Sequence, residues 1–452
     1  KMTKQLPQFI IAAPTSNSGK TTITLGLLRA LENRGIVTQP FKVGPDYIDP
    51  KFHKVACGKN GLNLDLFMTT SEDILQTYAK YSANKGAVCV EGVMGLFDGA
   101  RKSEGSTAEV AKLLKLPVVL VVDAKSVAYS VAPLLYGFKN FDKALNIAGV
   151  IFNRVNTKSH YQFLVEGCED VGIPALGHVP FLPACEIPSR HLGLSIEEMQ
   201  GYDAVIENVA NAMEETVDID SLLNCCLIDE KKHLKSTSIS TSKKITIAVA
   251  EDGGFNFSYV QNIECLKELG TVEFFSPLKD KKLPTVDLVY LPGGYPEFYT
   301  KQLSENTGML QSIKSFAEAG GKIIAECGGM MYLGKSIIDK DGNEFEMANV
   351  FDFSTSMQAM KLSLGYRTIQ FDNFELKGHE FHYSTIIKNQ NSKSIAKVLN
   401  AREMEVDTVI FQYKNVIASY IHYYFGQEKL LTNLLKIITK PIVCNFRKSI
   451  NT

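Results

Sequence analysis

The stretch AECGGMMYL, residues 325–333, sets Cys327 between an apolar run and a pair of glycines. KIIAE before the cysteine predicts a strand, Gly328 and Gly329 allow a sharp turn, and MMYLGKSI begins a helical pattern. Such a strand–turn–helix exposes a nucleophile and aims a helix N-terminus at it, which predicts a lowered thiol pKa. The alternative is that Cys327 is a buried, inert thiol, as we expect of the other eight cysteines.

A thiol nucleophile needs a base and donors for the oxyanion. The loop LPGGYPE, residues 291–297, follows the preceding predicted strand and offers the N–H groups of Gly293 and Gly294 as an oxyanion hole. Of the eight histidines, His422 follows the apolar run VIASYI, as the partner of a nucleophile would. We therefore predict a Cys327–His422 pair, although a lone histidine is more often structural.

A second chemical motif lies near the N-terminus. FIIAAPTSNSGKTTITLGLLRAL reads as strand, loop and helix, and it fits G-x-x-x-x-G-K-[ST] except that Pro14 replaces the first glycine. Lys20 is placed to reach the β- and γ-phosphates of a nucleotide, and the Thr21 hydroxyl is placed to hold Mg²⁺. The alternative is a plain Gly/Ser turn before a helix. The predicted ATP contacts are Thr15, Asn17, Ser18, Gly19, Lys20, Thr21 and Thr22.

Several carboxylates are candidates for the magnesium site. Glu91 follows the buried run AVCV, where a charge is costly without a cation or a donor. Asp46 and Asp49 lie in the loop FKVGPDYIDP after Lys42. We favour Asp46 as a magnesium ligand and place Asp49 second, although Asp is also common in such turns.

Two further residues are weaker candidates. Asp98 lies in the Gly-rich segment GLFDGARKSEG, which suits either a mobile loop over an anionic substrate or a solvated connection. Asn153 follows the predicted strand NIAGVIF, where its amide could read an adenine edge.

The elements that carry these residues predict an α/β fold. Short β-branched runs alternate with amphipathic stretches up to about residue 216, which is typical of βαβ units with a mainly parallel sheet flanked by helices. HLKSTSISTSKK, residues 233–244, reads as a linker, and the pattern restarts at ITIAVA. We predict two domains, 1–232 and 245–452, joined by the linker 233–244.

Composition narrows the function to small-molecule chemistry. The 452 residues carry a formal net charge of -1, which favours neither nucleic acid nor an acidic membrane as partner. The nine scattered cysteines include no CxxC pair, and they suit reduced thiols in the cytoplasm. Neither a signal peptide nor a membrane span is indicated.

The motifs, taken in order, resemble one family over nearly the whole chain. PTSNSGKTT, FKVGPDYIDP, NGLNLD, EGVMGLFDG, FNFSY, LPGGYPE, CGGMMYL, LGYR, GHEFHYS and ASYIHYYF are similar to the motifs of the cobyrinate a,c-diamide synthases. The N-terminal half of this family resembles dethiobiotin synthetase, a P-loop enzyme, and the C-terminal half is similar to the triad glutamine amidotransferases.

The resemblance implies a ligase that uses ATP, Mg²⁺ and L-glutamine to amidate the a- and c-carboxylates of cobyrinic acid in cobalamin biosynthesis. Cys327 would form a thioester with glutamine, His422 would move protons, and N–H groups near Gly294 and Gly328 would stabilise the oxyanion. ATP would convert the substrate carboxylate to an acyl phosphate, which ammonia attacks. The metal ligands would be Thr21, Asp46 and Glu91, and the contacts to the acyl-phosphate region would be Lys42, Asp49 and Asp98.

The resemblance leaves some points open. Triad amidotransferases carry Glu two residues after the catalytic histidine, but residue 424 is Tyr, as in the resembled subfamily. Glu380 or a backbone carbonyl could orient His422 instead. A homodimer is one option for the oligomeric state.

Rival functions remain. Hydrogenobyrinic acid or nickel-sirohydrochlorin could replace cobyrinic acid as the substrate. A regulatory P-loop ATPase with a degenerate amidotransferase domain is a different class, but it predicts a broken nucleophile site.

Overall fold

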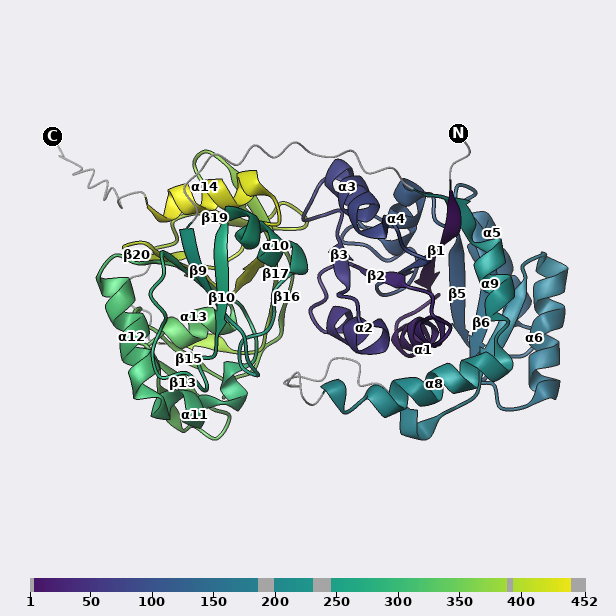
Figure 1. Ribbon diagram of the computed structural model, residues 1–452, viewed down its shortest axis with the longest axis horizontal. Coiled ribbons are helices and arrows are strands. Elements are labelled where there is room, and N and C mark those ends of the chain that lie inside the picture. The colour runs from purple at the N-terminus through teal and green to yellow at the C-terminus, as the bar shows by residue number, and fades with distance from the viewer. Residues whose placement is uncertain (1–3, 186–198, 231–244, 388–392, 440–452) are drawn as a thin grey trace. The chain divides into compact units, whose positions relative to one another are not determined.

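The computed structural model describes residues 4–185, 199–230, 245–387 and 393–439. The chain divides into two compact units, residues 1–240 and 241–452, here called the N-terminal and C-terminal units. Each unit contains its own sheets and helices, and the predicted α/β class is confirmed (Figure 1). The predicted linker, residues 233–244, lies outside the described residues. None of the helices within the described ranges has the length and apolar character to cross a membrane.

The N-terminal unit is built on an eight-stranded sheet whose main path runs β3-β2-β4-β1-β5-β6-β7. Neighbours along this path are parallel, and β8 adds an antiparallel pairing with β1. Because β4 and β5 flank β1, the strand order reverses at β1, and ligands of such sheets bind at the carboxyl ends of the strands beside this point. The strands are β1 (Gln5–Ala12), β2 (Thr38–Val43), β3 (Leu62–Leu64), β4 (Ala87–Glu91), β5 (Val118–Asp123), β6 (Ile147–Asn153), β7 (Ala175–Val179) and β8 (Leu227–Asp229).

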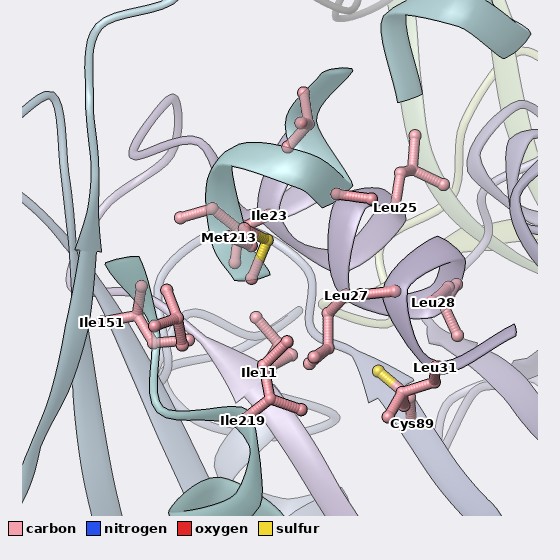
Figure 2. Packing of buried hydrophobic residues seen from close by; sticks show 14 of the residues in the cluster. Ile11, Ile23, Leu25, Leu27, Leu28, Leu31, Cys89, Ile151, Met213 and Ile219 are labelled. Carbon is pink, nitrogen blue, oxygen red and sulfur yellow. The ribbon is translucent and has the colours of Figure 1, made fainter. Parts of the chain in front are cut away.

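Helix α1 (Lys20–Asn33) is fixed by packing on both the sheet and a second helix. Ile23 and Leu27 are fully buried in a cluster that includes Ile11 of β1 (Figure 2). Helix α8 (Asp203–Thr216) packs on α1 at Gly26, where an added Cβ would lie 2.5 Å from Val209 Cγ1. The N-terminus of α1 is therefore held firmly at the end of β1.

The other helices of this unit connect the strands. They are α2 (Asp49–Cys57), α3 (Ser71–Ser82), α4 (Thr107–Leu114), α5 (Val131–Phe141), α6 (Lys158–Val171), α9 (Ile219–Cys225) and the 3₁₀ turn η1 (Pro183–Cys185).

The C-terminal unit is built on a six-stranded sheet of order β10-β9-β11-β12-β21-β20. All pairs are parallel except β20 with β21. The carboxyl ends of β11 and β12 therefore meet at one edge, and the chain segments that follow these two strands lie side by side. The strands are β9 (Ile245–Ala250), β10 (Gly270–Phe275), β11 (Leu288–Leu291), β12 (Lys322–Glu326), β20 (Phe411–Tyr413) and β21 (Val416–Ser419).

Two four-stranded sheets, β14-β13-β15-β18 and β19-β16-β17-β22, complete this unit. These sheets were not predicted from the sequence, because six of their strands have only three or four residues and the two longer ones, β16 and β17, contain no continuous apolar run. Their strands are β13 (Ser336–Ile338), β14 (Glu344–Glu346), β15 (Ser354–Ser356), β16 (Ser363–Gln370), β17 (Glu375–His382), β18 (Thr385–Ile387), β19 (Lys397–Asn400) and β22 (Ile421–Tyr423). The helices of the unit are α10 (Val260–Leu269), α11 (Thr300–Glu305), α12 (Thr307–Glu318), α13 (Gly328–Leu333), α14 (Glu428–Ile438) and the 3₁₀ turn η2 (Pro296–Phe298).

Candidate active sites

The loop between β1 and α1 has the backbone form of an anion-binding turn. Asn17 and Gly19 have positive φ angles of 62° and 94°, and alternation of this kind turns successive N–H groups toward one point. Ser18 Oγ donates to the carbonyl of Thr15 over 2.8 Å, which ties the loop together. Gly19 is required here, because an added Cβ would also lie 2.1 Å from Asn153 Nδ2.

Lys20 and Thr21 begin α1, and both side chains already have partners. Lys20 Nζ donates to the carbonyl of Met94 over 2.6 Å, and Thr21 Oγ1 donates to Glu91 Oε1 over 2.6 Å. Burial, together with the nearby charge of Lys42, lowers the pKa of Lys20 to about 8. An anionic phosphate at this place would supply the missing negative charge and keep Lys20 protonated.

Glu91 is the centre of a buried ionic cluster at the end of β4. Its side chain is fully buried and bonds Lys42 Nζ at 3.0 Å and His53 Nε2 at 2.7 Å, besides Thr21. Burial alone would raise the pKa of Glu91, but Lys42 and His53 hold it well below its usual range. Lys42 also pairs with Asp49 at 2.6 Å, and these carboxylates raise its pKa despite burial. Burial and the nearby carboxyl group of Asp46 raise the pKa of Asp49, so the charge of the cluster lies chiefly on Glu91 and Lys42.

Asp46 and Asp49 have different surroundings. Asp46 Oδ1 accepts hydrogen bonds from the backbone N–H groups of Ile48 and Asp49, over 2.8 and 2.9 Å, and so forms the turn that starts α2. Asp49 Oδ2 lies 3.4 Å from Thr21 Oγ1. The structure thus brings Asp49, which we ranked second, into the cluster with Thr21, while Asp46 supports the loop.

Asn153 and Asp98 border the phosphate loop. Asn153 Nδ2 donates to the carbonyl of Ser18 over 3.0 Å, and its Oδ1 accepts from the N–H of Arg154 over 3.0 Å. The amide of Asn153 therefore braces the phosphate loop. Asp98 is exposed, and its charge acts on Lys20.

The oxygen atoms around Thr21 suit magnesium bound to a nucleotide. Mg²⁺ in such sites takes one or two carboxylates and completes its coordination with phosphates and water. The hydroxyl of Thr21 is a hard oxygen donor, and carboxylate oxygens of Glu91 and Asp49 lie 2.6 and 3.4 Å from it. Within the described ranges, no group of three His, Cys, Asp or Glu residues forms a cage of its own for a metal. The donor set therefore fits a magnesium ion that arrives with its nucleotide.

In the C-terminal unit, Cys327 occupies a sharp turn between β12 and α13. Its φ of 45° and ψ of -105° are unusual for a residue with a side chain. The turn is held from both sides, because Cys327 N donates to the carbonyl of Ser419 over 2.7 Å and Met331 N donates to the carbonyl of Cys327 over 2.9 Å. Gly329 is required, since an added Cβ would lie 2.2 Å from the carbonyl oxygen of Leu291. The predicted strand–turn–helix is present.

The glycine loop after β11 lies against this turn. A Cβ on Gly328 would be 3.1 Å from Gly294 N, so the backbones of Gly294 and Gly328 approach each other closely. Gly294 has a φ of 157°, and a Cβ there would lie 2.1 Å from the carbonyl oxygen of Gly254. Neither glycine can carry a side chain without moving the loops apart. The close approach of the two backbones brings the N–H groups of Gly294 and Gly328 near each other.

His422 is brought to the same edge by β22. Tyr423 N donates to Glu326 Oε1 over 3.1 Å, which fastens the residue after His422 to the residue before Cys327. A Cβ on Gly293 would lie 2.1 Å from His422 Cε1, so the imidazole rests on the glycine loop. The structure therefore gathers the predicted nucleophile, base and glycines at one strand edge.

The protonation of His422 follows from its burial. Burial is the main cause that lowers its pKa to about 3, while a hydrogen bond to the backbone of Phe257 opposes the shift. Above this pH His422 is neutral and able to accept a proton. Glu380 and a backbone carbonyl were the two candidates to orient His422. Glu380 instead bonds Arg367 at 2.6 Å, His382 at 2.8 Å and Thr408 at 2.8 Å. The backbone of Phe257 is the partner that the geometry supports.

The prediction of a lowered thiol pKa is wrong. Burial raises the pKa of Cys327 well above its usual value, and the carboxyl groups of Glu297, Glu380 and Glu326 act in the same direction. The N–H of Gly328 offsets only part of this shift, because α13 is a helix of six residues with a small dipole. The resting site therefore holds a neutral thiol beside a neutral imidazole, and the base is needed to activate the thiol.

Two residues near these sites, His53 and Glu297, were not predicted from the sequence. His53 lies 38 positions from Glu91, and no local spacing connects the two. Glu297 ends LPGGYPE, so its place in a motif was a visible signal, but the loop was interpreted through its glycines alone.

Comparison with known proteins agrees with the division into two units. Residues 9–194 match the profile of the CobQ/CobB/MinD/ParA nucleotide binding domain, and residues 246–430 match that of the CobB/CobQ-like glutamine amidotransferase domain. Fold and sites together define a glutamine-dependent, nucleotide-binding ligase of two units.

Curated relatives identify the family. The cobyrinate a,c-diamide synthase of Caldanaerobacter subterraneus subsp. tengcongensis is 40% identical over 92% of this chain and 94% of its own length. That of Streptococcus sanguinis is 38% identical over 96% and 99%, and the hydrogenobyrinate a,c-diamide synthase of Brucella abortus is 39% identical over 92% and 97%. The chain belongs to the cobyrinate a,c-diamide synthase family of glutamine-dependent amidating ligases.

Proposed function

We propose that this chain amidates the a- and c-carboxylates of cobyrinic acid, with ATP and L-glutamine as co-substrates. The observation that carries the proposal is the pairing, in one chain, of a phosphate loop with its ionic cluster and a thiol turn with its glycine loop. A carboxylate is a poor electrophile and ammonium is a poor nucleophile. One site must activate the acid, and the other must release ammonia.

In the C-terminal unit, Cys327 attacks the side-chain amide of glutamine. The neutral imidazole of His422 takes the thiol proton as the C–S bond forms, and the N–H groups near Gly294 and Gly328 stabilise the oxyanion. The same imidazole then gives the proton to the leaving nitrogen, so ammonia departs and a thioester remains. Water hydrolyses the thioester to glutamate and restores the thiol.

In the N-terminal unit, the backbone N–H groups from residue 17 to residue 22 hold the ATP phosphates, with Thr15 supporting the loop. Lys20 exchanges the Met94 carbonyl for a phosphate oxygen. The substrate carboxylate lies beside Lys42, with Asp49 and Asp98 bordering the acyl-phosphate region, and it attacks the γ-phosphate to form an acyl phosphate and ADP. Ammonia then displaces phosphate and forms the amide. Asn153 contributes to this site by bracing the phosphate loop and, in our proposal, by facing the adenine.

Magnesium is part of the proposal. Thr21, Glu91 and Asp49 would hold the ion, with Asp46 behind them in the turn that places Asp49. When bound, Mg²⁺ neutralises charge on the transferring phosphoryl group. The residues of this chain fix the triphosphate and the carboxylate in line, which is the main protein contribution to phosphoryl transfer.

The test is a substrate panel. The purified chain is incubated with ATP, Mg²⁺ and glutamine, and with cobyrinic acid, hydrogenobyrinic acid or nickel-sirohydrochlorin in turn, and the products are separated and weighed by mass spectrometry. We expect two amidations of cobyrinic acid. Faster conversion of hydrogenobyrinic acid would assign the chain to the substrate in the name of the Brucella relative. No amidation of any tetrapyrrole would refute the proposal.

A further inference from the structure

Three carboxyl groups act electrostatically on the Cys327 thiol, and two of them are satisfied within the protein. Glu380 pairs with Arg367 and His382, which lower its pKa to about 2 although burial opposes them. Glu326 accepts from the hydroxyl of Tyr290 over 2.9 Å and from the N–H of Tyr423 over 3.1 Å. The third carboxyl group, Glu297, is different.

Glu297 has a carboxyl oxygen that is covered and unpaired. Its Oε2 is buried and has no hydrogen-bond partner in the described part of the chain. Its own backbone N–H offers the hydrogen bond that acts on its pKa, and burial raises this pKa to about 7. Within the described ranges Glu297 forms no ion pair. A buried carboxylate oxygen without a donor is destabilising, so the arrangement needs a compensating ligand or a functional reason.

The position of Glu297 points to such a reason. It lies in η2, directly after the glycine loop, and the preceding residue, Pro296, contacts the start of α13: a Cβ on Gly328 would lie 2.8 Å from Pro296 Cδ. The charge of Glu297 contributes to the raised pKa of the Cys327 thiol and to that of the buried Tyr420 hydroxyl. Cys327 also contributes to the raised pKa of Tyr420. Glu297 therefore belongs to the surroundings of the nucleophile.

We propose that Glu297 binds the α-ammonium group of the glutamine donor. This inference rests on the proposed function and names the part of that site that selects the donor. A free amino acid carries its reacting amide at one end and a cationic ammonium group, with three N–H donors, at the other. The ammonium group supplies the hydrogen bond that Oε2 of Glu297 lacks within the described residues, and it supplies a counter-charge.

The contact between Glu297 and the ammonium group determines which amides the site accepts as nitrogen donors. Glutamine fits, whereas glutarate monoamide, which is glutamine without its amino group, leaves Glu297 unpaired. Nα-acetylglutamine, which cannot carry the ammonium charge, does the same. A site built around a polar group of its substrate rejects analogues that lack the group, because its own buried partner then stays unsatisfied. Glutamine residues within peptides are excluded for the same reason.

The test is ammonia release from glutamine, glutarate monoamide and Nα-acetylglutamine by the full chain and by Glu297→Gln. We expect the wild-type chain to prefer glutamine strongly. In the variant, kcat/KM for glutamine should fall about 10- to 100-fold, the equivalent of one charged hydrogen bond, mainly through KM. The rate with glutarate monoamide should stay the same. Glu305→Gln, at an exposed carboxylate on the adjacent helix α11, is the matched control and should change neither rate.

The outcomes separate this inference from the proposed function. A wild-type chain that releases no ammonia from glutamine overturns both. The inference alone is overturned if the wild-type chain releases ammonia normally but Glu297→Gln lowers the rates with glutamine and with glutarate monoamide equally. It is also overturned if the preference of the variant for glutamine over glutarate monoamide is unchanged. Retained ligase activity with ammonium chloride and a normal thermal unfolding curve show that the variant is folded. Should Glu297→Gln not fold, a wild-type chain that uses glutarate monoamide as well as glutamine still refutes the contact.

Discussion

Glu91 and Glu297 are both carboxyl groups beside a reaction site, but the protein treats them in opposite ways. Glu91 is held by Lys42, His53 and Thr21, and its pKa lies well below the usual range. Glu297 has a buried oxygen that finds no hydrogen-bond partner among the residues that the structure describes, and burial raises its pKa to about 7. The first site is electrostatically assembled before a ligand arrives. The second site is left incomplete, and a cationic substrate would complete it.

The same contrast applies to the residues that do the chemistry. Lys20 and Lys42 bring positive charge to the N-terminal site, as a triphosphate requires. Cys327 and His422 are both neutral in the resting C-terminal site, because burial disfavours their charged forms. Phosphoryl transfer depends on fixed charges, whereas amide hydrolysis by a thiol needs charge only as the reaction proceeds.

The largest expected effect is on glutamine-dependent amidation, when the nucleophile of the C-terminal site is removed. Cys327→Ala should lower glutamine-dependent amidation by about 10³-fold or more, because no other group forms the thioester. Amidation with ammonium chloride should continue at its normal rate. Cys225→Ala, at an exposed thiol, is the control and should change neither rate. Unaltered glutamine hydrolysis in Cys327→Ala would remove the assignment of this site.

The reciprocal experiment breaks the N-terminal site. Lys20→Ala should lower ATP-dependent amidation about 10²-fold or more, with glutamine or with ammonium chloride, since the phosphate charge loses its buried partner. Hydrolysis of glutamine should persist in the absence of tetrapyrrole. Lys54→Ala, on helix α2, is the matched control. An amidation rate that is insensitive to Lys20→Ala would contradict the phosphate site.

The neutral imidazole predicts a pH dependence of stability. His422 has a pKa of about 3 in the folded chain and about 6.5 when unfolded. Between these values the unfolded chain binds a proton that the folded chain does not, so stability falls as the pH decreases below about 6.5. From pH 6.5 to 5 this contribution is about 2 kcal/mol.

The measurement is the free energy of unfolding of wild-type and His422→Asn chains between pH 5 and 8. We expect the difference between the two to shrink as the pH falls, because the variant lacks this titration. Parallel curves for the two chains would show that His422 is not held neutral by burial.

The smallest expected effect concerns the fixing of Glu91. His53→Ala should lower ATP-dependent amidation about 10-fold, because Glu91 loses one of its hydrogen bonds and its orientation. His53→Gln keeps a donor at this place and should recover part of the rate. Glutamine hydrolysis should be unchanged in both variants. Equal losses with Ala and Gln would point to a general packing defect in place of a positioning role.

Local chemistry was readable from the sequence alone. The phosphate loop and the thiol turn each lie within about ten consecutive residues, where glycines, small residues and a following helix define the backbone. Alternation of β-branched runs with amphipathic stretches likewise defined the α/β class. The two small sheets were missed, because their two longest strands, β16 and β17, mix exposed, partly buried and buried residues without a continuous apolar run.

Only the tertiary structure decided which distant groups meet and which of them are charged. It joined His53 to Glu91 and brought Asp49 to Thr21. It also fastened Tyr423, the residue after His422, to the strand that precedes Cys327. It also reversed the expected pKa shift of the thiol. The physical reason is that a pKa depends on burial and on the charges within a few ångströms, and these are set by the packing of strands that lie far apart in the sequence.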